Sequence, residues 1–138
     1  MNKNPKYIHF KKFYSKNGYL FFLEKSNHQI NNLPIKVNRI FFTTAKKNTI
    51  RGEHAHIYCS QLIICIRGKV TINTISKKNK KKKFIISEQK SRALFVPNLI
   101  WNTLKFEKNN SIIAVMCDHK YNRKKDYIEN LKKFLKND

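Results

Sequence analysis

The apolar residues of this chain fall into short segments rich in Ile, Val, Phe and Tyr, the residue types that suit a pleated surface. Only three glycines and three prolines occur between and within them, so Asn, Ser and Lys must form most of the turns. Many short strands at close spacing favour an antiparallel sandwich or barrel. We therefore predict an all-β fold with strands at residues 19–23, 38–43, 55–59, 61–67, 69–75, 83–87, 93–96, 101–106 and 111–117.

The C-terminal segment changes to a helical period, and Asp126 precedes it as a candidate N-cap. We predict one amphipathic C-terminal helix here, which packs on the β domain through Tyr127, Ile128, Leu131, Phe134 and Leu135. A chain of 138 residues, 41% of them hydrophobic, is long enough for one compact core. Residues 1–138 are therefore predicted to form a single domain.

The net charge of +22 is the most unusual bulk property. Clustered Lys and Arg side chains bind phosphate backbones, so the charge by itself admits a nucleic-acid ligand. However, the lysines are spread through every segment, and the run at residues 77–83 is typical of a solvated hairpin tip. The positive field would equally attract a small molecule that carries a diphosphate. We therefore expect no nucleic-acid partner.

The cysteine and hydropathy patterns favour an intracellular protein. Cys59, Cys65 and Cys117 have no CxxC spacing, and each lies in or beside an apolar run, where a free cysteine behaves as a small hydrophobic residue. The first ten residues lack the apolar stretch of a signal peptide, and no apolar run is as long as a membrane span. We expect a cytoplasmic protein with no membrane partner.

The segment from Arg51 to His56 carries the residues best suited to chemistry. His54 and His56 are separated by one residue, so alternation along a strand directs both side chains to one face. Two imidazoles in one cavity are suited to bind a metal ion or to move protons near neutral pH. Arg51 indicates an anionic or oxygen-rich ligand beside them. The alternative is that both histidines have only a structural role.

A metal site requires more ligands than this pair supplies. A carboxylate a few residues downstream would help to complete it, but that position holds Gln61. The later segment 97–102 contains Trp101 and no histidine, and His119 lies beyond the last strand in a basic stretch. Two imidazoles alone hold a divalent ion weakly, so we expect no metal. Proton transfer next to a carbonyl group, or ligand binding, then remains for the pair.

The order of these motifs along the chain resembles the dTDP-sugar 3,4-ketoisomerases. The most specific part is Arg51-Gly52-Glu53-His54-Ala55-His56 followed by Gln61. It is flanked, in similar order and spacing, by Gly18-Tyr19-Leu20, Leu33-Pro34, Arg39-Ile40-Phe41-Phe42, Gly68, Val96-Pro97, Trp101, Tyr121 and Asp126-Tyr127-Ile128. The resemblance extends from about residue 17 to the C-terminus.

This resemblance implies a cupin, which is a jelly-roll β-barrel, and a homodimer that exchanges N-terminal strands. It also implies that a dTDP-4-keto-6-deoxyhexose is converted through an enediol to its 3-keto isomer, without a cofactor. The product would serve the 3-amino deoxysugars of a bacterial surface glycan, such as a lipopolysaccharide O-antigen. One histidine of the pair is implied to be the base at C3. We assign the base to His56 and proton delivery at C4 to His54.

The same resemblance implies substrate-binding residues. Arg51 and Arg39 are expected to hold the substrate, and Gln61 is expected to hydrogen-bond within the cavity. Trp101 would line the barrel, although a core aromatic is an equal interpretation of this residue.

Two positions depart from the family pattern. The family commonly has a tyrosine in the strand that begins at Arg39, where this chain has Phe41 and Phe42. It also often has a lysine at the position of Ile57. Tyr58 is the candidate replacement for the missing phenol, because strict alternation directs it to the face of the two histidines.

Two other functions remain open within the same fold. The dTDP-sugar 3,5-epimerases also use a histidine base, but they pair it with a carboxylate and generally have longer chains. The sequence offers no such carboxylate beside the histidines, since Glu53 should face away from them. A non-catalytic protein that binds a sugar nucleotide is the other alternative, because a fold does not guarantee an activity.

Overall fold

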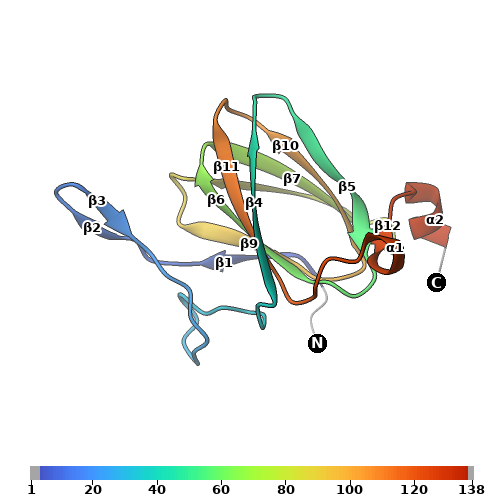
Figure 1. Cartoon of the computed structure of the whole chain (residues 1–138), viewed down its shortest axis with the longest axis horizontal. Helices are drawn as coiled ribbons and strands as arrows, with labels where there is room; N and C mark the ends of the chain where they lie inside the picture. Colours follow the sequence, from blue (N-terminus) through green and yellow to red (C-terminus); the bar gives the residue numbers. More distant parts are fainter. Residues whose placement is uncertain (1–3, 137–138) are drawn as a thin grey trace.

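The computed structural model describes residues 4–136 and confirms the all-β class. Two five-stranded antiparallel sheets and one small hairpin make up the molecule (Figure 1). The first sheet has the order β1 (Lys6–His9), β9 (Arg92–Val96), β6 (Gln61–Arg67), β11 (Ser111–Cys117) and β4 (Arg39–Ala45). The second has the order β12 (Tyr127–Ile128), β5 (Ile50–His56), β10 (Ile100–Phe106), β7 (Lys69–Ser76) and β8 (Lys81–Ser87). The hairpin consists of β2 (Phe13–Ser15) and β3 (Gly18–Leu20), and it projects away from the sheets (Figure 1).

Most predicted strands match the observed ones. Strands β6 and β11 coincide with the prediction, and β4, β7, β8, β9 and β10 differ from it by one or two residues at an end. Only the beginning of the predicted strand 19–23 is a strand, and β1 and β2 were not predicted. The prediction at 55–59 is displaced, because β5 begins at Ile50 and ends at His56. Pairing with β10 makes a strand of the Arg, Gly, Glu and His residues of β5, whose own strand propensity is low.

The main hydrophobic core lies between the two sheets. Leu94, Ile113 and Val115 belong to it from the first sheet, and Val70 and Ile72 from the second; each is at most 2% exposed. The three cysteines are free and buried, as expected for small core residues. Within residues 4–136, no helix has the length and apolar character needed to cross a membrane.

The predicted C-terminal helix is present as α2 (Leu131–Lys136) and packs on the sheet through Leu131, Phe134 and Leu135, but its predicted start after Asp126 is wrong. A single turn, α1 (Arg123–Asp126), ends at this residue, and the side chain of Asn122 caps it by accepting a hydrogen bond from the Lys125 N–H. The chain then extends as β12 along the edge of β5, and α2 (Leu131–Lys136) begins only after that. The open edge of β5 offers backbone hydrogen bonds that outweigh the helical period of the side chains.

Closure into a barrel remains a prediction. In the part of the chain that the structure describes, no strand of one sheet pairs with a strand of the other. The sheets approach each other through side chains instead, and the cavity described next lies between them at the side of β4 and β5.

Candidate active site

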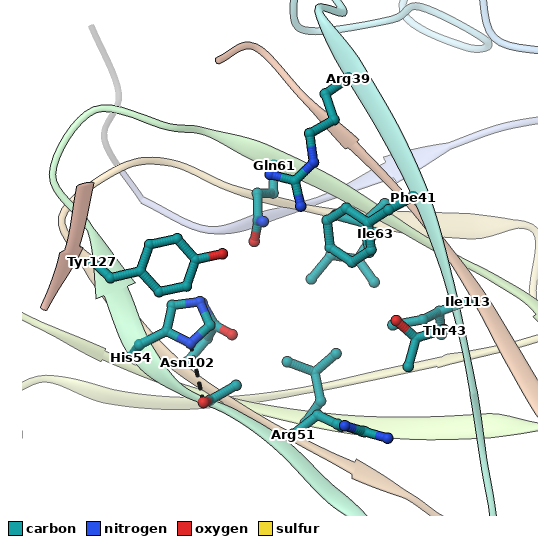
Figure 2. Close-up of a pocket in the computed structure, with 13 residues that line it drawn as sticks. Arg39, Phe41, Thr43, Arg51, His54, Gln61, Ile63, Asn102, Ile113 and Tyr127 are labelled. Atoms are coloured by element: carbon teal, nitrogen blue, oxygen red, sulfur yellow. Dashed lines mark hydrogen bonds between the residues drawn. The ribbon is translucent and has the colours of Figure 1, made fainter. Parts of the chain in front are cut away.

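A cavity of about 210 Å³ lies between β4, β6 and β11 of one sheet and β5, β10 and β12 of the other (Figure 2). Four of the residues singled out in the sequence line it, namely Arg39, Arg51, His54 and Gln61. The other lining residues are Phe41, Thr43, Gly52, Ile63, Asn102, Leu104, Ile113, Val115 and Tyr127. The cavity therefore combines an apolar floor with a few converging polar groups, as ligand sites generally do.

A β-bulge in β5 directs Arg51 and His54 into the same cavity. His54 lies opposite Asn102, and Gly52 lies opposite the next residue of β10, so Glu53 is an extra residue without a partner. Gly52 and Glu53 have positive φ angles of 83° and 61°. A Cβ atom on Gly52 would lie only 2.9 Å from the Asn102 carbonyl oxygen, so the turn requires glycine here. The bulge reverses the alternation, which by itself would send Arg51 and His54 to opposite faces.

His54 and His56 form a hydrogen-bonded pair, as the alternation predicted. Their Nε2 atoms lie 3.1 Å apart, and the Nδ1 atom of His54 lies 3.0 Å from the Gly52 carbonyl oxygen. Because a carbonyl only accepts, His54 carries its proton on Nδ1. The Nδ1 atom of His56 lies 2.6 Å from Oδ2 of Asp126, a carboxylate, so His56 is also protonated on Nδ1. One further proton between the two Nε2 atoms completes the chain of hydrogen bonds.

Asp126 is the carboxylate partner that the sequence analysis did not find, and the expectation that none exists is wrong. It is 4% exposed, and its Oδ1 accepts hydrogen bonds from the backbone N–H groups of Tyr58 at 2.7 Å and Cys59 at 3.3 Å. Burial alone would raise the pKa of this carboxyl group, but the hydrogen bonds from Tyr58 and His56 lower it below its usual value. Asp126 is therefore ionised at neutral pH and holds the His56 ring in one orientation.

Burial also lowers the pKa values of both histidines below 6.5. The hydrogen bond to the Gly52 carbonyl opposes this effect at His54, and the hydrogen bond to Asp126 opposes it at His56. A proton shared between the two rings is consequently released easily. The pair can thus alternate between a proton-free state and a state with one shared proton, which is the property required of a general base that later acts as an acid.

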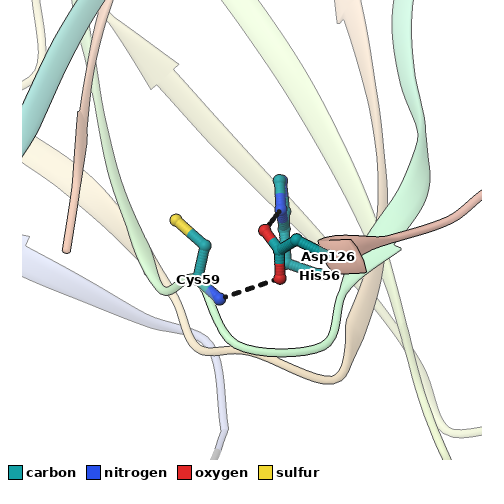
Figure 3. A group of neighbouring side chains, drawn as sticks. All are labelled: His56, Cys59 and Asp126. Carbon is teal, nitrogen blue, oxygen red and sulfur yellow. Dashed lines mark hydrogen bonds and ion pairs between the residues drawn. The ribbon is translucent and has the colours of Figure 1, made fainter. Parts of the chain in front are cut away.

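The side chains of His56, Cys59 and Asp126 also bring possible metal ligands together (Figure 3). Their ligand atoms lie within 4.8 Å of one another. Both carboxylate oxygens already accept hydrogen bonds from the protein, and the Cys59 thiol donates to the Ser60 carbonyl. The hydrogen bond with Cys117, together with burial, raises the pKa of the Cys59 thiol, so it keeps its proton. In these contacts Asp126 supports the ring of His56, and both carboxylate oxygens and the thiol have partners within the protein.

Arg39, Gln61 and Tyr127 lie above His54 in Figure 2. The guanidinium of Arg39 reaches towards the cavity and also lies 4.7 Å from the centroid of the Phe41 ring. Gln61 is buried, and its amide donates to the sulfur of Cys117 at 3.6 Å. These groups bring one fixed positive charge and several hydrogen-bond donors to the same wall of the cavity.

Two residues predicted to bind the substrate lie elsewhere. Tyr58 does not line the cavity, because β5 ends at His56 and the alternation ends with it; its side chain is 57% exposed. Trp101 points to the opposite side of β10 from Asn102 and packs in a separate apolar cluster with Phe134, 6.0 Å between ring centroids. Of the two interpretations of Trp101, the core aromatic is the one that the structure supports.

His56 also differs in place from His54. His54 lines the cavity, whereas His56 lies behind it and is 4% exposed. Asp126 and Tyr127 are the residues of this site that pattern reasoning interpreted as helix. The motif Asp126-Tyr127-Ile128 had a place in the family resemblance, and that was the one available signal that these residues belong to the site.

Comparisons with known proteins show which proteins this chain resembles. A family model described as "FdtA: WxcM-like, C-terminal" matches residues 3–138. A TDP-4-oxo-6-deoxy-alpha-D-glucose-3,4-oxoisomerase of Aneurinibacillus thermoaerophilus is 25% identical over 94% of this chain and 91% of its own length. The 3,4-ketoisomerase QdtA of Thermoanaerobacterium thermosaccharolyticum was solved as a variant in complex with TDP-4-keto-6-deoxyglucose. It is 25% identical to this chain, with a TM-score of 0.83, and the match covers 98% of this chain and 94% of the QdtA chain. The TDP-fucose-3,4-ketoisomerase WlaRA of Campylobacter jejuni is 26% identical, with a TM-score of 0.79. The match covers 96% of this chain and 93% of the WlaRA chain.

Proposed function

The chain belongs to the FdtA family (WxcM-like, C-terminal), and on this premise we propose that it is a dTDP-sugar 3,4-ketoisomerase. Its substrate is a dTDP-4-keto-6-deoxyhexose, and its product is the 3-keto isomer. The carbonyl group moves from C4 to C3 while one proton moves from C3 to C4 and another from O3 to O4. The observation that carries this proposal is the chain of hydrogen bonds through His54, His56 and Asp126 at the wall of the cavity.

We assign the base at C3 to His54, the reverse of the assignment made from the sequence. His54 lines the cavity and His56 does not, and a base must reach the proton that it removes. The proton taken from C3 then occupies the position between the two Nε2 atoms, and the charge of Asp126 stabilises it there. His56 and Asp126 thus hold the proton until it is returned to C4.

The negative charge of the enediolate requires hydrogen-bond donors and positive charge near the two sugar oxygens. Arg39 and Gln61 supply both at the wall facing His54 (Figure 2). Arg51 lies in the same lining but is exposed to solvent, which suits a contact with the diphosphate of the nucleotide. The net charge of +22 would attract such an anion from solution.

The sequence disfavoured a 3,5-epimerase because it showed no carboxylate beside the histidines. Asp126 is such a carboxylate, so the two reactions must be distinguished by the carbon atoms at which they exchange protons. An epimerase removes the proton at C5 as well as C3, whereas a ketoisomerase acts at C3 and C4 only. The names of the relatives support the isomerase. A protein that only binds the sugar nucleotide would catalyse neither reaction.

Incubation with dTDP-4-keto-6-deoxyglucose in heavy water separates these functions. The isomerase is expected to give a 3-keto product that carries deuterium at C4, with exchange also at C3 of the remaining substrate, as measured by NMR and mass spectrometry. Deuterium at C5 would support the epimerase and contradict our proposal. Substrate that binds but exchanges no hydrogen would identify a binding protein.

A homodimer is part of the proposal, with the N-terminal region as the contact. The β2–β3 hairpin exposes Phe13, Tyr14, Tyr19 and Leu20, and it pairs with no other strand among residues 4–136. One edge of β4 is also unpaired, and Phe42 beside it is 68% exposed. Such apolar surface on a projecting arm and a sheet edge favours association with a second copy. Light scattering after gel filtration should give twice the 16.5 kDa chain mass, and a monomer at micromolar concentration would contradict the dimer.

We further propose that the reaction takes place in the cytoplasm. The three buried cysteines are free, which suits a reducing compartment. The 3-keto product is the substrate that an aminotransferase requires to place an amino group at C3. Fractionation of cells that express the protein should recover it with the cytoplasmic enzymes; recovery in the periplasm would contradict this part.

A further inference from the structure

Tyr127 brings a second ionisable group into the cavity beside His54. Pairing of β12 with β5 places Tyr127 opposite His56. The centroid of its ring lies 4.5 Å from that of each imidazole, stacked on His54 and edge-on to His56. The hydroxyl group points into the cavity, towards Gln61 and Arg39 (Figure 2).

Among the described residues that line the cavity, His54 and Tyr127 are the two whose side chains ionise between neutral and alkaline pH and can therefore both release and accept a proton. The two arginines stay protonated, and the amide and hydroxyl groups of the other polar lining residues do not ionise in this range. The isomerisation proposed above moves two protons, one between carbon atoms and one between oxygen atoms. The histidine pair can hold one of them at a time, because its two Nδ1 atoms are already protonated.

We propose that Tyr127 is a catalytic residue that carries the proton between the two sugar oxygens, while His54 carries the proton between the two carbons. This inference rests on the proposed function. As His54 removes the C3 proton, the electrons of the C3–H bond form the C3–C4 double bond, and O4 takes the proton of the phenol. In the second half, the phenolate takes the proton of O3, the C3 carbonyl forms, and C4 takes the proton held by the histidine pair. The phenol and the histidines end as they began, and no other reactant is consumed.

The surroundings of Tyr127 suit both halves of this cycle. Burial raises the pKa of the phenol, so the resting enzyme holds it protonated and ready to donate. The charge of Arg39 and its hydrogen bond to the phenol act in the opposite direction and stabilise the transient phenolate. Phe41 lines the cavity but has no hydroxyl group, and Phe42 is exposed, so Tyr127 supplies the one phenol among the described lining residues.

The test compares Tyr127→Phe with the wild type and with Tyr121→Phe. Phenylalanine keeps the ring against both histidines and removes only the hydroxyl group. We expect kcat to fall by about 10²–10³-fold, in the range of general acid catalysis, with KM and TDP affinity changed by less than about 3-fold. Tyr121 packs on Tyr127 with 5.9 Å between ring centroids but does not line the cavity, so Tyr121→Phe should keep the wild-type kcat within about 2-fold.

A pH profile separates a catalytic phenol from a structural one. The alkaline limb of kcat reports ionisation of the phenol and should disappear in Tyr127→Phe, while the acidic limb remains. Incorporation of 3-fluorotyrosine at position 127, which lowers the phenol pKa, should move that limb to lower pH. A kcat of Tyr127→Phe within about 3-fold of the wild type, or an unmoved limb with fluorotyrosine, would overturn this inference alone. A wild-type protein that folds, binds TDP and isomerises nothing would overturn the proposed function itself.

Discussion

The Oδ2 atom of Asp126 lies 2.6 Å from the Nδ1 atom of His56, although 70 positions separate the two residues in the sequence. Both side chains are almost fully buried, so water does not screen this interaction. The contact keeps the Nδ1 proton of His56 in place and directs its Nε2 atom to His54. The proton transfer that we propose for the cavity therefore depends on a residue that does not line it.

Replacement of Asp126 by Asn removes the charge and keeps the size of the side chain. Because Asp126 raises the pKa of His56, its loss should lower that pKa further and move the acidic limb of the pH–rate profile to lower pH. We expect kcat to fall by about 10–100-fold with unchanged TDP affinity, as for other groups that orient a catalytic imidazole. Glu107→Gln is the control, since Glu107 also accepts a hydrogen bond, that of the Thr71 hydroxyl, but lies outside the cavity lining. If the acidic limb of Asp126→Asn lies at the same pH as that of the wild type, Asp126 does not tune the pKa of His56.

The two histidines should differ when each is replaced by Asn. His54→Asn removes the group that reaches C3, so we expect turnover to fall by about 10²–10⁴-fold and deuterium exchange at C3 to stop. His56→Asn keeps His54 in the cavity and should leave measurable exchange at C3 with slow product formation. Isothermal titration with TDP checks that both variants still bind the nucleotide. Normal turnover by His54→Asn would show that the base is another residue.

Stability should fall as the pH drops below about 6.5, the unfolded-state value for histidine. Burial lowers the folded-state pKa of His54 and His56, so between the two values the unfolded chain binds more protons than the folded one. The lowered pKa of Asp126 acts below its usual value of 3.8 and leaves this window unaffected. Urea titrations from pH 8 to pH 5 measure the slope, which the double variant of His54 and His56 to Asn should reduce. If the free energy of unfolding depends on pH equally steeply in that variant, groups other than these two histidines cause the dependence.

Trp101 should affect stability and not substrate binding. Its ring packs against Phe134, the fully buried residue of α2, and neither residue lines the cavity. We expect Phe134→Ala to lower the free energy of unfolding by about 3–5 kcal/mol and Trp101→Phe to lower it by less. KM for the dTDP-sugar should stay within about 2-fold of the wild type in Trp101→Phe. A rise in KM without a loss of stability would indicate that Trp101 contacts the substrate.

Local pattern was sufficient where the relevant contacts are close in sequence. Alternation placed His54 and His56 on one face because a strand repeats every second residue, and the structure has them hydrogen-bonded. Arg51 lines the same cavity although strict alternation would separate it from His54, because the bulge at Glu53 adds one residue. Alternation failed at Tyr58, because the strand had already ended at His56. A bulge and a strand end depend on the pairing partner, which local pattern does not contain.

Residue type, spacing and motif order were enough to predict the β class, most of the strands, the histidine pair and the family. The place of Asp126 and Tyr127 in the site follows from the assembled sheets instead. Their period suggested a helix, and the open edge of β5 drew Tyr127 into a strand and set Asp126 behind His56. A hydrogen bond between distant residues depends on how the sheets assemble, and no local spacing encodes that distance.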